Sequence, residues 1–161
     1  MTPWVLSSGA RRPLAAAWFA FFGFLAASVF FLRPHVRFSV LCLYVLLPSL
    51  AAAIAGYIWG GAILDFTTTR SPGNSMLRGM GVTAGAFLIF AVLYALGLPL
   101  VERGWSIKQA GGILVAALTL GLIMVGPLIL IAGMIAGVTL YMLGRRALTE
   151  RDGQAPDHPT V

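Results

Sequence analysis

The chain has 161 residues, of which 59% are hydrophobic and 10% are charged. A soluble domain carries about 25% charged residues to cover its surface, so this composition excludes an ordinary water-soluble protein. The formal net charge is +6. The basic residues lie in short segments between apolar runs, so we expect them to contact anionic lipid headgroups and not nucleic acid. The chain has one cysteine, Cys42, so it cannot form an intramolecular disulfide or a CxxC motif.

Four apolar runs follow one another along the chain, and each is long enough to span a hydrocarbon core about 30 Å thick. Because lipid offers no partner for backbone polar groups, each run is expected to be helical. The runs cover residues 14–32, 38–64, 80–101 and 113–143. The sequence therefore predicts an all-α integral membrane protein with four transmembrane helices, arranged as two hairpins, in a single domain over residues 14–143.

The first run, 14–32, follows Arg11 and Arg12, as the apolar part of a cleaved signal peptide would. It is longer than the usual 7–15 residues of such a segment and continues past the sequence LAAS at 25–28. We therefore favour a retained transmembrane helix over a cleaved leader.

Two prolines interrupt the longer runs. Pro48 lies in the second run and Pro127, after Gly126, lies in the fourth. Each removes one backbone hydrogen bond, so each is expected to kink its helix. The alternative for the fourth run is a break at Gly126-Pro127 into two short re-entrant segments, which would require polar residues to line a cavity.

The distribution of Lys and Arg predicts the orientation. Four spans place both termini and the middle loop on one side, which carries Arg11, Arg12, Arg70, Arg78, Arg145, Arg146 and Arg151. The opposite side carries Arg33, Arg37, Arg103 and Lys108. The richer side is expected in the cytoplasm, which gives a multi-pass protein of the cell inner (plasma) membrane. Its cytoplasmic parts are an N-terminal segment, 1–13, and a mostly disordered tail, 144–161.

Glycines recur at four-residue spacing on three of the predicted helices. This spacing places two glycines on one helix face and lets a neighbouring backbone approach closely. The candidate helix-packing residues are Gly56 and Gly60, Gly81 and Gly85, and Gly133 and Gly137. Contacts of this kind can form within one chain or between chains, so a homo-oligomer or a larger membrane complex is expected.

Asp65, one of five acidic residues, ends the second run. It lies about 40 Å from the start of that run at 1.5 Å per residue, so it is expected at the cytoplasmic headgroup level, within reach of Arg70 or Arg78. The alternative is an acid inside the membrane, where such residues are usually functional. Ser75 is the expected N-cap of the third helix.

The first outer turn contains Arg33, His35 and Arg37. A lone histidine without nearby Cys, Asp or Glu does not make a metal site, so these residues are expected to contact lipid headgroups. No catalytic triad, HExxH motif or paired carboxylates occur, so neither catalytic nor cofactor-binding residues are predicted. The sequence favours a non-enzymatic accessory, assembly or scaffold protein that packs through its small-residue faces. The alternative is an oligomeric small transporter or channel that uses Asp65.

Overall fold

The computed structural model describes residues 8–31, 42–67, 69, 71–101 and 107–152. Its helical elements in chain order are α1 (Ser8–Phe31), the π-helical turn η2 (Cys42–Leu46), α3 (Leu47–Trp59), the 3-10 turn η3 (Gly60–Leu64), α4 (Pro72–Val101), α5 (Ile107–Met124) and α6 (Gly126–Asp152). No strand occurs within these ranges. The prediction of an all-helical chain is therefore confirmed.

Three helical stretches are long and apolar enough to cross a membrane, judged by length and composition. They are Tyr44–Leu64, Pro72–Leu96 and Gly126–Thr149, and Lys108–Met124 is a shorter apolar helix. The chain thus has the helices that a helical membrane protein requires. The first predicted run, 14–32, falls in α1 as far as Phe31.

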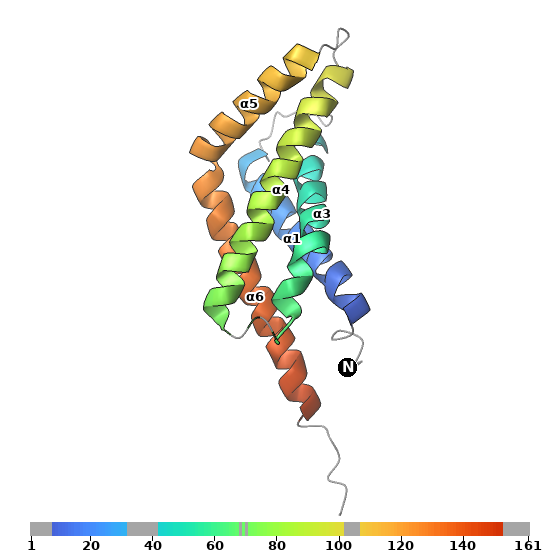
Figure 1. The fold of residues 1–161 in the computed structure, drawn as a ribbon, viewed down its shortest axis with the longest axis vertical. Coiled ribbons are helices and arrows are strands. Elements are labelled where there is room, and N and C mark those ends of the chain that lie inside the picture. Colours follow the sequence, from blue (N-terminus) through green and yellow to red (C-terminus); the bar gives the residue numbers. More distant parts are fainter. Residues whose placement is uncertain (1–7, 32–41, 68, 70, 102–106, 153–161) are drawn as a thin grey trace, which may run out of the picture.

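The helices α1, α3, α4 and α6 run side by side, whereas α5 leans away from them beside the upper part of α4 (Figure 1). The closest pairs are α1 with α3 and α4 with α6, and contacts between α3 and α4 join the two pairs. The start of α1, the connection 65–71 and the last turns of α6 all lie at one end of the bundle (Figure 1). This end is called the polar end below.

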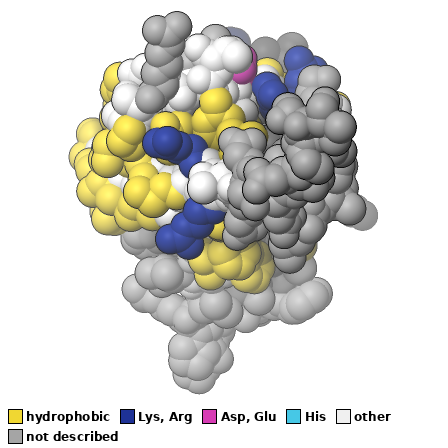
Figure 2. All heavy atoms as spheres, turned by 90° about the horizontal axis from the view of Figure 1, so that it is seen from below, with side chains coloured by type: hydrophobic (Ala, Val, Ile, Leu, Met, Phe, Trp, Pro, Cys, Tyr) yellow, Lys and Arg dark blue, Asp and Glu magenta, His cyan; other side chains and the backbone are white. Residues whose placement is uncertain are grey.

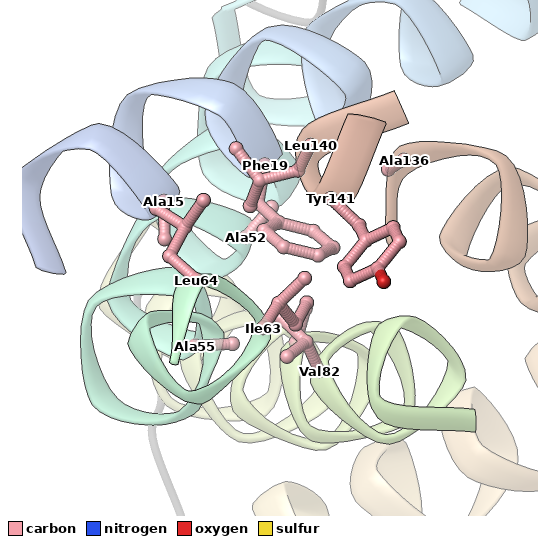
Figure 3. Close-up of a cluster of buried hydrophobic side chains, with 11 residues drawn as sticks. Ala15, Phe19, Ala52, Ala55, Ile63, Leu64, Val82, Ala136, Leu140 and Tyr141 are labelled. Atoms are coloured by element: carbon pink, nitrogen blue, oxygen red, sulfur yellow. The ribbon is translucent and has the colours of Figure 1, made fainter. Parts of the chain in front are cut away.

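Small residues fill the inside of the bundle and large apolar residues cover its outside. Alanines dominate the buried set, among them Ala15, Ala52, Ala55 and Ala136. The largest buried side chains form one cluster where α1, η3, α4 and α6 meet; Figure 3 shows Phe19, Ile63, Leu64, Val82, Leu140 and Tyr141. Leucine, isoleucine and methionine side chains project outward from every helix from α3 to α6. A soluble protein buries such residues, so this distribution suits a lipid environment.

Pro48 lies in the first turn of α3, directly after the π-helical turn η2. A proline is tolerated there because the N–H groups of the first turn have no partner within the helix. The Ser49 hydroxyl donates a 2.6 Å hydrogen bond to the Val45 carbonyl across the junction. The irregularity expected from Pro48 thus takes the form of a wide turn followed by a new α-helix.

Pro127 lies at the junction of α5 and α6, where Val125 separates the two helices. Hydrogen bonds still cross the junction, from Val125 N–H to the Gly121 carbonyl at 3.0 Å and from Ile129 N–H to the Val125 carbonyl at 2.9 Å. Figure 1 shows α6 continuing away from α5 toward the polar end. The fourth predicted run is therefore one bent helical rod, and the two halves do not turn back on each other as re-entrant segments would.

Both ends of the described chain are more helical than expected. The helix α1 begins at Ser8, inside the segment 1–13, and α6 continues through Asp152, inside the tail 144–161. The extension of α6 contains Ala147, Leu148 and three arginines, all of which favour a helix. Adding residues to an existing helix avoids the cost of nucleation, so the helix continues beyond the apolar run.

Candidate functional site

Asp65 lies at the polar end, directly after η3, and pairs with the start of α1. Its Oδ1 atom is 3.6 Å from Nη1 of Arg11, and the two side chains are 32% and 30% exposed. The same oxygen accepts hydrogen bonds from the Thr67 hydroxyl at 2.7 Å and the Thr67 N–H at 3.3 Å. A partly exposed pair of this kind contributes at most about 1 kcal/mol, so its main effect is to fix the position of the acid.

Arg78 reaches back from α4 and binds the end of η3. Its Nη1 atom donates to the Ala62 carbonyl and, at 2.6 Å, to the Thr69 hydroxyl. The buried Thr69 hydroxyl in turn donates to the same Ala62 carbonyl at 2.8 Å. A positive charge at the C-terminal end of a helix interacts favourably with its dipole. Arg78 is unfavourable for the start of α4, and the structure shows that it caps the preceding helix instead.

The helix α4 begins one turn before the expected N-cap, Ser75. It starts at Pro72, and the Ser71 hydroxyl accepts a 3.2 Å hydrogen bond from the Asn74 N–H. Serine at the N-cap followed by proline at the first helical position is a favourable start for a helix. The Ser75 hydroxyl is buried and donates to the Pro72 carbonyl at 2.6 Å, so Ser75 belongs to the first turn of α4.

Aromatic residues pack beside this polar network, between η3 and α6. The Phe66 and Tyr141 rings lie 5.6 Å apart, and the Arg145 guanidinium carbon lies 6.0 Å from the Tyr141 ring centre. Gly144 leaves room for this packing, because a Cβ atom there would lie 2.8 Å from Phe66 and 2.9 Å from Leu64. The last turns of α6 are thereby held against the same connection that carries Asp65.

Gly56 of α3 and Gly60 of η3 pack closely against α1. A Cβ atom on Gly56 would lie 2.9 Å from the Ala15 carbonyl oxygen and 3.1 Å from the Ala16 Cα atom. One on Gly60 would lie 2.9 Å from the Ala15 Cβ atom. These two predicted packing residues therefore lie in a helix contact within the chain.

The helices α4 and α6 approach each other closely through glycines. Gly133 and Gly137, both on α6, face Gly79 on α4, and a Cβ atom on Gly137 would lie 3.0 Å from the Gly79 Cα atom. A Cβ atom on Gly79 would overlap the Gly133 carbonyl oxygen. The sequence pattern singled out Gly81, but nothing lies within 4 Å of a Cβ atom placed there. The small residues of α4 that face α6 are Ser75, Gly79 and Thr83, which repeat at the same spacing of four.

Gly85, the fourth-position partner of Gly81 in the sequence pattern, faces a different helix. A Cβ atom on Gly85 would lie 2.9 Å from the Cε3 atom of Trp59 on α3. The two glycines thus have different environments, because only Gly85 receives a neighbouring side chain.

A few polar groups join helices within the apolar part of the bundle. The Trp18 indole N–H donates to the Ala136 carbonyl at 3.1 Å and ties α1 to α6. The hydroxyls of Tyr44 and Tyr94 lie 3.0 Å apart and link η2 to α4. Such bonds suit an environment where water cannot satisfy polar groups.

Several predicted contact residues lie outside the described residues. They are Arg70 and the outer-turn residues Arg33, His35 and Arg37. Within the described ranges, no three His, Cys, Asp or Glu side chains come together as a metal ion would need.

Comparisons with known proteins give no relative for this chain: no protein-family model, no curated protein and no solved structure matches it. Its function is therefore argued from its own residues.

Proposed function

We propose that this chain is a non-enzymatic protein of the inner membrane, with an accessory, assembly or scaffold role. The observation that carries the proposal is the inverted distribution of side chains: small residues inside and large apolar residues outside. The charged side chains with hydrogen bonds or ion pairs at the polar end use them to hold helices together, as Arg11, Asp65 and Arg78 do. An arrangement of this kind builds a rigid membrane body.

The proposed topology has four passes. The first two are α1 and the stretch from η2 through η3, and the last two are α4 and the bent rod of α5 and α6. These form two hairpins with both termini in the cytoplasm. The excess of arginine around the polar end supports this orientation under the positive-inside rule.

The glycine contacts sharpen the proposed mode of assembly. Gly56, Gly60, Gly85, Gly133 and Gly137 all face neighbouring segments of the same chain. They support a compact protomer, so a partner is expected to meet other surfaces. Positions where an added Cβ would have open space include Gly81 on α4 and Gly111 and Gly112 on α5.

The transporter or channel alternative depends on Asp65. In its favour, the ion pair with Arg11 joins α1 to the connection between η3 and α4. A change in the charge of Asp65 would therefore alter a contact at the point where the two hairpins meet. Against it, Asp65 lies at the end of the candidate span Tyr44–Leu64 and not within it. An acid that carries ions across a membrane is usually found inside the helical bundle.

The experiment that tests the proposal is purification in a mild detergent, followed by reconstitution into liposomes. The proposal expects a stoichiometric partner, either a second copy or a different membrane protein, and liposomes that do not move protons or cations. Flux that is abolished by Asp65→Asn but retained in Thr67→Ala would contradict the proposal and support the transporter. Thr67→Ala is the matched control because it removes a partner of Asp65 but keeps its charge.

A further inference from the structure

The arginines whose side chains the structure describes at the polar end fall into two groups. Arg11 pairs with Asp65, and Arg78 binds the Ala62 carbonyl and the Thr69 hydroxyl. The side chains of Arg12, Arg145 and Arg146 make no hydrogen bond or ion pair with any described residue. The first group is tied to the fold, whereas the side chains of the second group are exposed.

Arg145 packs against an aromatic ring on the preceding turn of α6. Its guanidinium carbon lies 6.0 Å from the centre of the Tyr141 ring, which is itself buried and packed against Phe66. A cation over an aromatic face keeps its charge, and the guanidinium keeps its five N–H donors in a planar fork. Such a fork suits the oxygens of a phosphate group.

Arg12 borders the same segment as Arg145. A Cβ atom on Gly61 would lie 3.2 Å from the Cγ atom of Arg12, and Gly144, next to Arg145, packs against Leu64. Gly61 and Leu64 are three residues apart in the 3-10 turn η3, so they lie on the same side of it. The start of α1 and the last turns of α6 therefore both pack against η3, and their arginines lie at the same end of the bundle.

The surface just above these arginines is apolar. Met142 and Leu143 are 52% and 47% exposed and come one turn before Arg145 and Arg146 on α6. Residues three and four apart share a helix face, so an apolar strip leads directly to a basic one. A phospholipid presents its acyl chains and its phosphate in this same order.

Acidic side chains do not offset this charge among the described residues. Asp65 is the one acid whose side chain the structure describes, and its Oδ1 already binds Arg11 and Thr67. Figure 2 shows Lys and Arg side chains with hydrophobic ones between them on this end of the molecule. We infer that Arg12, Arg145 and Arg146 form a binding surface for the phosphate headgroup of an acidic phospholipid. The inference depends on the membrane placement proposed above.

The test compares spin-labelled phosphatidylglycerol with spin-labelled phosphatidylcholine at the surface of the full chain, reconstituted in phosphatidylcholine vesicles. The wild-type protein is expected to prefer the acidic lipid, with a preference that falls as salt rises. Replacing all three arginines by glutamine is expected to abolish this preference. Each arginine in contact with the headgroup contributes about a fivefold change in relative affinity.

Two control proteins make the result specific. Lys108→Gln removes one exposed charge at the start of α5 and is expected to reduce the preference far less than the triple glutamine variant does. A variant with lysine at all three arginine positions keeps the charge and is expected to retain most of the preference. A triple glutamine variant with undiminished preference, or an equal loss in Lys108→Gln, would overturn the inference.

Two further outcomes separate the possible failures. If soluble glycerol phosphate displaces the labelled lipid at equal concentration, the surface binds free phosphate, and the lipid assignment is overturned. If the wild-type protein does not float with the vesicles, the membrane placement fails and the lipid surface fails with it. Flotation without any preference for the acidic lipid overturns only the lipid surface.

Discussion

The two closest helix pairs reach close contact in different ways. Between α1 and α3, the glycines alternate: Gly23 of α1 faces Ala52, and Gly56 of α3 faces the backbone at Ala15. Between α4 and α6, Gly79 lies directly against Gly133 and Gly137. In the first pair each of these glycines meets one Cβ atom as well as backbone atoms, whereas in the second pair Gly79 meets only backbone atoms of Gly133 and Gly137.

This difference predicts how each interface responds to added volume. A methyl group at Gly79 would overlap its neighbour more deeply than one at Gly23 or Gly56, and close-packed interiors resist the helix movement that would relieve the overlap. We therefore expect α4–α6 to be the less tolerant interface. Substitution of single glycines by alanine tests this, since alanine adds one methyl group and otherwise favours helices.

The largest effect is expected for Gly79→Ala. The new methyl group would overlap the Gly133 carbonyl oxygen and lie 3.0 Å from the Gly137 Cα atom. We expect a loss of about 3 kcal/mol in the free energy of unfolding, at the upper end of the range for overpacking. Denaturant titration of the protein in detergent micelles measures it. A loss no greater than that of Gly56→Ala would contradict the proposed difference between the interfaces.

A smaller loss, about 2 kcal/mol, is expected for Gly56→Ala. The methyl group would lie 2.9 Å from the Ala15 carbonyl oxygen and 3.0 Å from the Phe19 Cβ atom, so α1 must shift by a few tenths of an ångström. The same titration measures the change. The NMR signal of the Trp18 indole N–H, which donates to the Ala136 carbonyl, would report whether α1 has moved, and an unchanged signal with full loss of stability would argue against this cause.

Gly85→Ala is expected to cost about 1 kcal/mol, because its obstacle is a side chain. The new methyl group would meet the Trp59 ring, which is 47% exposed and has space to move outward. Tryptophan fluorescence should shift together with the small loss of stability. A loss as large as that of Gly79→Ala would mean that the Trp59 ring is fixed.

Gly81→Ala provides the matched control two residues from Gly79. Nothing lies within 4 Å of the new methyl group, and alanine favours a helix over glycine by up to about 1 kcal/mol. The free energy of unfolding should stay the same or rise. A clear decrease in an oligomeric sample but not in a monomeric one would show that Gly81 faces another chain.

These glycines also show the limit of the sequence pattern. Spacing identifies which glycines share a face, but it does not say which face meets a neighbour. Gly81 has a small residue four positions later, Gly85. Gly79 also belongs to a four-residue repeat of small residues, with Ser75 before it and Thr83 after it. Counting serine and threonine among the small residues would have found the face that α6 contacts.

Asp65 and Arg78 show the same limit for charges. The expected partners of Asp65 came from nearby sequence, whereas the ion pair that the structure describes is with Arg11, at the start of another helix. Antiparallel packing of the first two helices brings those ends together, so the hairpin topology contained this signal. The sequence did not predict that Arg78 binds the Ala62 carbonyl. This contact crosses the turn between η3 and α4, so it depends on the residue at which η3 ends.

The small-residue core has a consequence for the entropy of folding. Alanine and glycine have no side-chain rotamers to lose, whereas leucine, isoleucine and methionine lose a measurable amount of freedom when buried. Here the residues with rotamer freedom mostly point outward from the bundle, and those without it fill much of the interior. Assembly of the helices therefore fixes few side-chain torsions. A modest gain in van der Waals contact is then enough to hold them together.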